Sequence, residues 1–171
     1  MNDDTALMDI ESIKQLKARY CRYLDTKDWD RWRDLFTDDF VGDTTAAGGA
    51  VIVGGDEFMA YTRHTIGRPS QATVHHVHAP EIELTSATTA RGIWALNDIV
   101  RLVPALTLHG YGHYHETYEK RDGHWRITTS QLTRLREDIA VPLMPQRIAR
   151  RVRAMAASFA RRRAPRSLTD I

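Results

Sequence analysis

The hydrophobic pattern of this chain changes its period at Gln71, and this change limits the possible folds more than any other feature. Before Gln71, apolar residues recur at intervals of three and four, the spacing of amphipathic helices. From Gln71 on, apolar and polar residues alternate as in half-buried strands. Four long segments show the alternation: 72–84, 89–103, 106–120 and 124–137. Asp122-Gly123, between the last two segments, is a strong hairpin-turn signal.

Helices followed by a run of antiparallel strands predict an α+β domain with the helices on one face of the sheet. Gly92, Gly110 and Gly112 fall inside the long strands, where they permit strong curvature. We therefore expect a cup with a helical lid, which encloses a pocket. The length of the patterned region is that of a single domain, over residues 1–140.

The first helix is expected to begin near Asp9, as its N-cap, and to end near Asp25. Its apolar stripe consists of Ile10, Ile13, Leu16, Tyr20, Tyr23 and Leu24. Its solvent side is expected to hold Lys14, Lys17, Arg19 and Arg22. Two more helices, around 29–36 and 56–67, flank two short strands within 42–55.

Asp25 falls where the apolar stripe of the first helix should continue. An acid at the C-terminus of a helix opposes the helix dipole, so local stability does not explain it. Pairing with a histidine across the pocket would explain it, because a carboxylate on one imidazole nitrogen leaves the other free as a base. The alternative is that Asp25 caps the next helix.

Asp98 also occupies an apolar face, because Trp94, Leu96 and Val100 share its parity. An unpaired carboxylate is costly there, so Asp98 is a candidate site residue. A wrong face assignment and a structural ion pair with an arginine are the alternatives.

Alternation places His75 with Val77 on one face of the first long strand, and His76 with His78 on the other. A histidine metal site needs its ligands on one face together with a carboxylate, so we expect no metal. His75 stands out from an ordinary structural histidine only because Tyr20, Asp25 and Asp98 accompany it.

The bulk composition is that of an ordinary globular chain, with 42% hydrophobic and 27% charged residues. Cys21 is the only cysteine, which excludes an internal disulfide and a cysteine-based zinc site. The chain has no apolar run of the roughly 20 residues that a membrane span needs. Its acidic N-terminus does not resemble a secretion signal. A cytoplasmic protein is therefore expected.

The basic charge is concentrated in residues 141–171, which hold eight arginines and one acid. We expect an Arg-rich, partly helical extension, because Ile148, Val152, Met155 and Phe159 form a helical stripe. Docking on the sheet of the same or a neighbouring subunit is the favoured role. Binding to a membrane surface or to nucleic acid is the alternative.

Three blocks of the chain resemble the SnoaL-like branch of the nuclear transport factor 2-like superfamily. They are "DIESIKQLKARYCRYLDTKDWD", "TVHHVHAPEIELTSATTARGIWALNDI" and "YEKRDGHWRI". Within that branch they are most similar to lyases of the bile acid dehydratase and scytalone dehydratase type. The resemblance implies a cone-shaped, curved mixed sheet, the cystatin-like roll, wrapped by N-terminal helices around one deep pocket.

The resemblance also implies a set of catalytic residues, matched block by block: Tyr20, Asp25, His75, Asp98 and Arg134. Arg136 competes with Arg134 because it lies two residues on. If Trp125 and Ile127 face the pocket, Arg134 needs a β-bulge to do so as well. The expected pocket walls are Leu16, Leu24, Trp94, Leu96 and Tyr114.

These residues predict a dehydratase that removes water from a hydroxylated apolar small molecule such as a steroid, terpenoid or polyketide. His75 would be the base, Tyr20 would polarise an oxygen, and one aspartate would assist the leaving group. No cofactor and no nucleic-acid partner are expected. A non-catalytic ligand-binding protein and a polyketide cyclase-like isomerase are the alternatives. The outer sheet face and the relatives predict a homo-oligomer, a trimer more than a dimer.

Overall fold

The computed structural model describes residues 3–103 and 105–141, and every structural statement below concerns these residues. The helices are α1 (Asp3–Thr26), α2 (Trp29–Arg33), the short 3-10 helix η1 (Thr45–Ala47) and α3 (Gly55–Ile66). The strands are β1 (Phe36–Asp43), β2 (Val51–Val53), β3 (Thr73–Leu84), β4 (Thr89–Val103), β5 (Leu106–Arg121) and β6 (His124–Ala140). The extension expected at 141–171 lies outside the described residues, apart from Val141.

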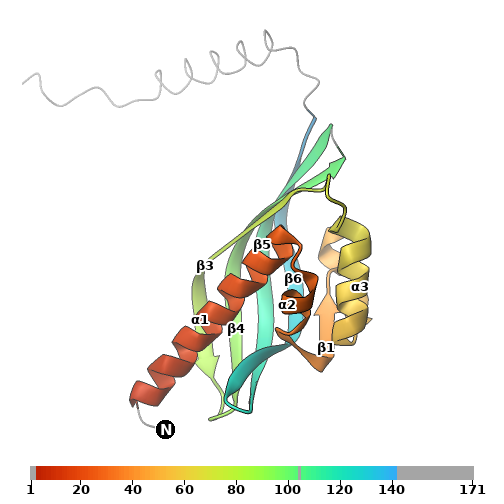
Figure 1. The fold of residues 1–171 in the computed structure, drawn as a ribbon. Helices are drawn as coiled ribbons and strands as arrows, with labels where there is room; N and C mark the ends of the chain where they lie inside the picture. Colours follow the sequence, from red (N-terminus) through yellow and green to blue (C-terminus); the bar gives the residue numbers. More distant parts are fainter. Residues whose placement is uncertain (1–2, 104, 142–171) are drawn as a thin grey trace, which may run out of the picture. The chain divides into compact units, whose positions relative to one another are not determined.

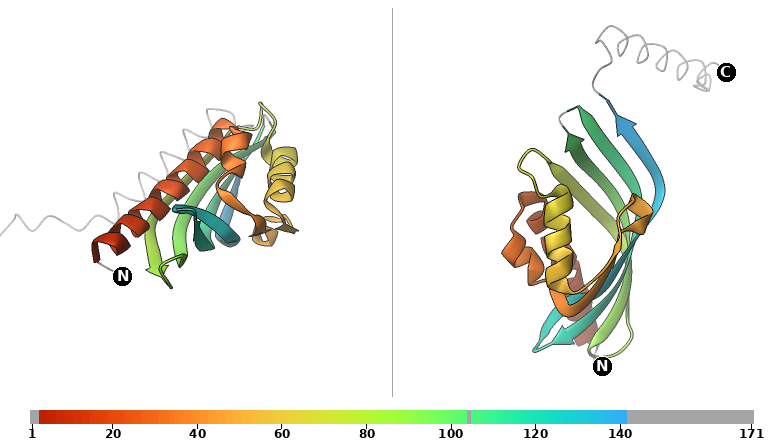
Figure 2. Two further views of the ribbon diagram at one scale, coloured as in Figure 1. Left: turned by 60° about the horizontal axis from the view of Figure 1, so that its bottom comes forward. Right: turned by 90° about the vertical axis from the view of Figure 1, so that its right-hand side faces the viewer.

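The described strands form one six-stranded sheet in the order β2-β1-β6-β5-β4-β3. β1 runs parallel to β6, and all other neighbours are antiparallel. The sheet is curved and unclosed, and the three α-helices lie against its concave side (Figures 1 and 2). The expected α+β fold, a curved mixed sheet covered by N-terminal helices, is therefore confirmed.

Aromatic side chains fill the space between β1 and the helices. Trp32 of α2 stacks on Phe58 of α3 with a ring-centroid distance of 5.5 Å. Phe36 and Phe40 of β1 lie 4.5 Å apart, and each also contacts Phe58. This cluster fixes α2 and α3 against β1, because buried aromatic pairs contribute both area and geometry.

The first strand begins earlier than expected. The sequence predicted a helix through Phe36 and a strand from Gly42, whereas α2 ends at Arg33 and β1 begins at Phe36. Phe36 and Phe40 are four residues apart, a spacing that fits one helix face as well as alternate positions of a strand. Both are buried, and Asp38 between them is exposed, so tertiary packing decided the outcome.

Two residues of α1 were placed wrongly by the sequence pattern. Asp9 is not an N-cap, because α1 already includes Asp3; it is buried and accepts hydrogen bonds from Lys120 Nζ at 2.7 Å and Trp125 Nε1 at 2.9 Å. Lys17 was assigned to the solvent side, but its side chain is fully buried. Both polar groups have partners on β5 and β6 that the helical pattern does not contain.

A β-bulge changes the facing of β6. Tyr118 pairs with Ile127 and Thr117 with Thr129, so Thr128 is an extra residue. Trp125 and Ile127 face inward before the bulge, and Ser130 and Leu132 face inward after it. The structure thus contains the bulge that an inward-facing Arg134 required.

No helix in the described part of the chain is both long and apolar enough to cross a membrane.

Candidate active site

A cavity of about 330 Å³ lies between the C-terminal half of α1, α3, the loop around η1 and the inner faces of β3 to β6. Its apolar wall includes Leu24, Phe58, Ile66, Val100 and Leu132. The polar side chains that line it include Tyr20, His75, Asp98, Tyr114, Arg134 and Glu137. The cavity therefore combines an apolar body with a few convergent polar groups, as small-molecule sites do.

His75 and Asp25 form a hydrogen-bonded pair at one wall of the cavity. His75 Nδ1 lies 2.7 Å from Asp25 Oδ1, and the backbone N–H of His75 donates to Asp25 Oδ2 at 2.8 Å. Thr73 Oγ1 lies 2.9 Å from Asp25 Oδ1. His75 lines the cavity and Asp25 does not, so Asp25 sits behind the ring. The last turn of α1 thereby holds the imidazole from its far side.

Only one nitrogen of His75 is engaged by Asp25. Within the described residues, no hydrogen bond to His75 Nε2 is formed, and that atom is not among the fully buried polar atoms that lack a partner. A carboxylate accepts and does not donate when ionised, so Nδ1 carries the hydrogen of this bond. Nε2 then presents a lone pair toward the cavity, which is the arrangement of a general base.

Asp98 and Arg134 form a two-pronged ion pair. Arg134 Nη1 donates to Asp98 Oδ1 at 3.0 Å and Nη2 donates to Oδ2 at 2.9 Å. Arg134 Nε lies 3.1 Å from Glu137 Oε1, an ion pair without good hydrogen-bond alignment. The arginine partner that was an alternative explanation of Asp98 is therefore present. Arg136, the competing arginine, is exposed and pairs with Asp138 at 2.9 Å.

Gly110 makes the Asp98–Arg134 pair possible. Asp98 is on β4 and Arg134 is on β6, with β5 between them, and Gly110 pairs directly with Asp98 in the sheet. A Cβ at position 110 would collide with Asp98 Oδ1 and Arg134 Nη1. The glycine gap in the middle strand lets side chains from its two neighbours meet above it.

Tyr20 and Tyr114 line the cavity side by side, with ring centroids 5.9 Å apart. Burial raises the pKa of both phenols well above the usual value, and nearby charge from Glu116 adds to the effect on Tyr20. Both hydroxyls therefore stay protonated over the whole physiological range. They are suited to donate hydrogen bonds to a ligand oxygen.

Lys17 and Glu116 form a buried ion pair beneath the two tyrosines, with an Nζ–Oε1 distance of 2.6 Å and no side-chain exposure. The Lys17 ammonium lies 4.0 Å from the Tyr20 ring centroid and 3.7 Å from that of Tyr114. Glu116 also accepts hydrogen bonds from Tyr118 and Ser130. Every oxygen of this carboxylate is satisfied, as a buried charge requires.

The sequence could have indicated Lys17 but not its partner. Position 17 is four residues after Ile13 and three before Tyr20, so it lies on the stripe that was correctly read as buried. Glu116 is 99 residues away, and only the register of β5 brings it to Lys17.

The expected pocket walls divide into two groups. Leu24 and Tyr114 line the cavity, whereas Leu16, Trp94 and Leu96 do not. The latter three are buried in the core cluster, where Trp94 Nε1 donates to Tyr118 Oη at 2.7 Å. They pack among core side chains and not against the cavity, so the prediction that they are pocket walls is wrong for these three residues.

The histidines of β3 separate as alternation predicted. His75 is buried, and His76 and His78 are exposed. The described residues contain no group of three or more His, Cys, Asp or Glu side chains that could hold a metal ion.

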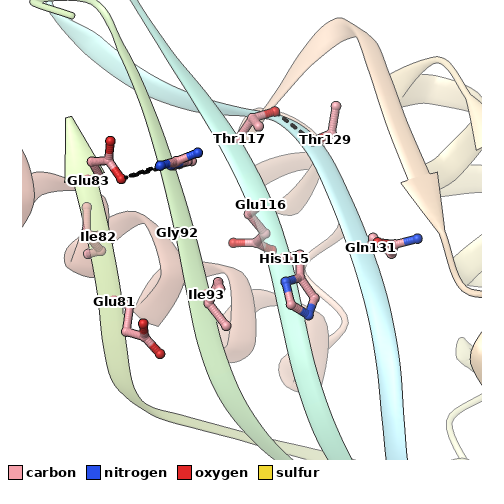
Figure 3. Close-up of a pocket in the computed structure, with 11 residues that line it drawn as sticks. Glu81, Ile82, Glu83, Gly92, Ile93, His115, Glu116, Thr117, Thr129 and Gln131 are labelled. Atoms are coloured by element: carbon pink, nitrogen blue, oxygen red, sulfur yellow. Dashed lines mark hydrogen bonds and ion pairs between the residues drawn. The ribbon is translucent and has the colours of Figure 1, made fainter. Parts of the chain in front are cut away.

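A larger hollow of about 640 Å³ lies on the other face of the sheet, away from the helices (Figure 3). Its polar groups include Glu81, His115 and the exposed Glu83–Arg91 ion pair. Among the described residues, it has no imidazole held by a carboxylate and no enclosing helix. We therefore assign the candidate site to the smaller cavity. Its polar groups and its burial suit catalysis, whereas the larger hollow exceeds it only in volume.

Comparisons with known proteins place the chain in a family. The model of the SnoaL-like domain family matches residues 5–131. A probable cyclase of Gibberella zeae is 24% identical over 135 residues, which cover 72% of this chain and 89% of that protein.

Solved structures share the fold. A putative scytalone dehydratase from Novosphingobium aromaticivorans has a TM-score of 0.72 at 23% identity, over 84% of this chain and 99% of that one. A hexachlorocyclohexane dehydrochlorinase from Novosphingobium barchaimii has a TM-score of 0.73 at 19% identity, over 84% of this chain and 99% of that one.

Proposed function

We propose, from the premise that this chain belongs to the SnoaL-like domain family, that its cavity is the active site of a lyase. The proposed reaction is the removal of water from a hydroxylated, mainly apolar small molecule, with every acid–base group supplied by the protein. The single observation that carries the proposal is the His75–Asp25 pair, with its free Nε2 at the cavity wall.

The proposed reaction begins with proton abstraction. His75 Nε2 takes a proton from a carbon next to a carbonyl, and the electron pair of the broken C–H bond forms an enolate. The Tyr20 hydroxyl, which burial keeps protonated, donates a hydrogen bond to the enolate oxygen. Asp25 stabilises the imidazolium that results and keeps its ring in place.

The leaving group receives the same proton. The enolate re-forms its carbonyl, the C–O bond breaks, and the departing hydroxyl takes the proton from Nε2 and leaves as water. The sequence assigned this acid to one of the aspartates. Asp25 is engaged by His75 and Thr73, and both oxygens of Asp98 accept from Arg134, so neither is placed to donate. His75 therefore serves as base and acid in turn.

The size of the cavity favours a compact substrate. Its volume of about 330 Å³ is at the lower end of the range of small-molecule sites, roughly 300–1,000 Å³. Trp94 and Leu96 are packed in the core and do not line the cavity, so they provide no further wall for a longer substrate. Among the expected classes, a small polyketide or terpenoid suits this cavity better than a steroid.

A cyclase is the second candidate, and the relative from Gibberella zeae favours it. Proton abstraction by His75 is the first step of an intramolecular aldol closure as well as of dehydration. The two reactions differ in the fate of the enolate, which attacks a second carbonyl in the cyclase and expels the hydroxyl group, protonated by His75, as water in the lyase.

Proton exchange in deuterated water tests the shared first step. A panel of β-hydroxy ketones and thioesters should exchange the α-proton when bound to the wild-type protein. His75→Ala should abolish exchange and keep the fold, and His76→Ala, on the outer face of the same strand, is the matched control. No exchange across the panel, together with unchanged ligand binding in His75→Ala, would favour the non-catalytic binding protein instead.

A further inference from the structure

The end of α1 has a backbone conformation that stability alone does not explain. Lys27 has a φ of 61° directly after the last residue of the helix. The N–H of Lys27 donates to Leu24 O at 3.2 Å and that of Asp28 to Tyr23 O at 2.9 Å, the two bonds of a Schellman motif. Glycine is the usual residue at this position, because a side chain strains the left-handed conformation.

The Lys27 side chain turns back toward the candidate site. Its Nζ donates to Thr73 Oγ1 at 2.9 Å, and Thr73 Oγ1 lies 2.9 Å from Asp25 Oδ1. Asp25 in turn holds His75 at 2.7 Å. Thr73 is buried and Lys27 is half-buried, so the ammonium is partly removed from water. Burial lowers the pKa of Lys27, and the charge of Asp25 opposes that effect.

Lys27, Thr73, Asp25 and His75 form a hydrogen-bonded string, and the charge of Lys27 determines which group donates at each step. An ammonium donates and never accepts, so Thr73 Oγ1 accepts from Lys27. The hydroxyl of Thr73 has a single hydrogen, which then points to Asp25. Asp25 accepts from Thr73 at Oδ1 and from the backbone N–H of His75 at Oδ2, so its ionised carboxylate accepts from the imidazole as well, and Nδ1 bears the hydrogen.

We propose that Lys27 is a positioning residue, which acts through Thr73 to hold Asp25 as an acceptor and His75 with its Nε2 lone pair facing the cavity. This inference rests on the proposed function, in which Nε2 is the base. Two observations support it independently: the hydrogen-bonded string and the lysine at a glycine position. A strained residue that persists at a site is a reason to look for a role there.

Charged groups on the cavity side do not replace Lys27. Arg134 faces the site from β6, but Asp98 and Glu137 both pair with it. Lys17 is paired with Glu116. The Lys27 ammonium is therefore the cation that acts on the Asp25 side of the imidazole, among the described residues.

Lys27→Gly is the sharpest variant, because it removes the ammonium and relieves the backbone strain together. Two-dimensional ¹H–¹⁵N spectra of the imidazole nitrogens report the tautomer and titration of His75, which His75→Ala identifies among the eight histidines. We expect the separation between the Nδ1 and Nε2 resonances of His75 to shrink, because an Asp25 that is no longer held as an acceptor lets the ring populate both tautomers. The melting temperature should stay the same or rise.

Three further variants separate positioning from a structural role. Thr73→Val breaks the hydrogen-bonded string in its middle and should shift the two resonances in the same direction. Lys27→Arg keeps a cation at this position, so its imidazole spectrum should stay close to that of the wild-type protein. Lys14→Met removes an exposed ammonium elsewhere on α1 and should change nothing. Unchanged spectra in both Lys27→Gly and Thr73→Val would overturn the proposal, whatever the melting temperatures do.

The spectra require no substrate, so the two proposals fail separately. Absence of exchange across the whole panel, with the expected spectral changes, would remove the lyase and leave the positioning role in place. If a compound does exchange, Lys27→Gly should lower kcat severalfold with little change in KM, since Lys27 does not line the cavity. Exchange at the wild-type kcat in Lys27→Gly would count against the inference.

Discussion

His75, the third residue of β3, contacts Asp25 in the last turn of α1, with 2.7 Å between Nδ1 and Oδ1 and a second contact through the backbone N–H of His75. The carboxylate thus fixes both the side chain and the main chain of the histidine. This double contact predicts that Asp25 controls the tautomer of His75 more than the stability of the fold.

Asp25→Asn should abolish most activity while the protein stays folded. An amide can donate its hydrogen to Nδ1, which would transfer the imidazole hydrogen to Nε2 and remove the base. The expected loss in kcat is roughly 10²–10⁴-fold. Rates of α-proton exchange measure it, and Asp28→Asn, at the partly exposed residue before α2, is the control. Exchange within about threefold of wild type in Asp25→Asn would contradict this role.

Gly110→Ala should disrupt the site without touching any group that we assign to chemistry. The new methyl group would occupy the space in which Asp98 and Arg134 meet. We expect a loss of about 1–3 kcal/mol in unfolding free energy, as for other overpacked sites. Urea unfolding measures it, with His109→Ala, the neighbouring position, as the control. A variant with wild-type stability and activity would show that the Asp98–Arg134 pair tolerates separation.

Lys17→Met should be among the most destabilising single changes in the domain. It leaves Glu116 buried without its cation, which costs about 3–5 kcal/mol in comparable cases. Adding Glu116→Gln should recover part of that loss, because the amide carries no charge. A double-mutant cycle by urea unfolding gives the coupling. Additive losses in the double variant would mean that the two groups do not interact in solution.

Protonation of the Asp9 carboxyl in acid should lower the free energy of unfolding. Burial alone would raise the pKa of this carboxyl, but hydrogen bonds from Lys120 and Trp125 outweigh it, and the net pKa is below the usual 3.8. A lowered folded pKa means that the stabilisation is present above the unfolded pKa and is lost as pH falls through the folded one.

Asp9→Asn should therefore be less stable than wild type near neutrality and approach it in acid. Urea unfolding from about pH 7 to about pH 3 measures the difference between the two proteins. Glu11→Gln, an exposed acid on the same helix, provides the control. A difference that stays constant over this range would show that Asp9 does not titrate with folding.

Exposed apolar side chains on the later strands support the prediction of a homo-oligomer. Leu135 and Ile139 of β6 are 75% and 62% exposed, and Val103 of β4 is 50% exposed. Burial of such residues between copies would remove their apolar area from water. Light scattering at micromolar concentration should give a trimer, and Leu135→Glu with Ile139→Glu should give a monomer. A monomeric wild-type protein would contradict the prediction.

Much of this fold could be predicted because its two halves have different hydrophobic periods. The alternation around Asp98 placed its side chain on the inner face without knowledge of any partner, and the same holds for His75. Asp25 could be predicted because it violates a helical stripe at a helix end. In each case the signal is local, within one strand or one turn.

The errors arose where a distant partner decided the outcome. Lys17 was assigned to solvent because lysine is rarely buried, and Glu116 on β5 overrides that tendency. Asp9 fits the description of an N-cap until Lys120 and Trp125 are known to face it. The bulge at Thr128, which turns Arg134 inward, lies in a run of polar residues that alternates equally well in either phase.

The parallel pairing of β1 with β6 determines when this protein can finish folding during its synthesis. Residues 36–43 acquire their partner only after residues 127–131 have been made. Until then Phe36 and Phe40 lack one side of their sheet, and the helices that precede them have nothing to enclose. Closure of so long a loop is slow. The nascent chain therefore lacks this partner strand while residues 44–126 are made, and we expect chaperones to bind its exposed aromatic side chains during that interval.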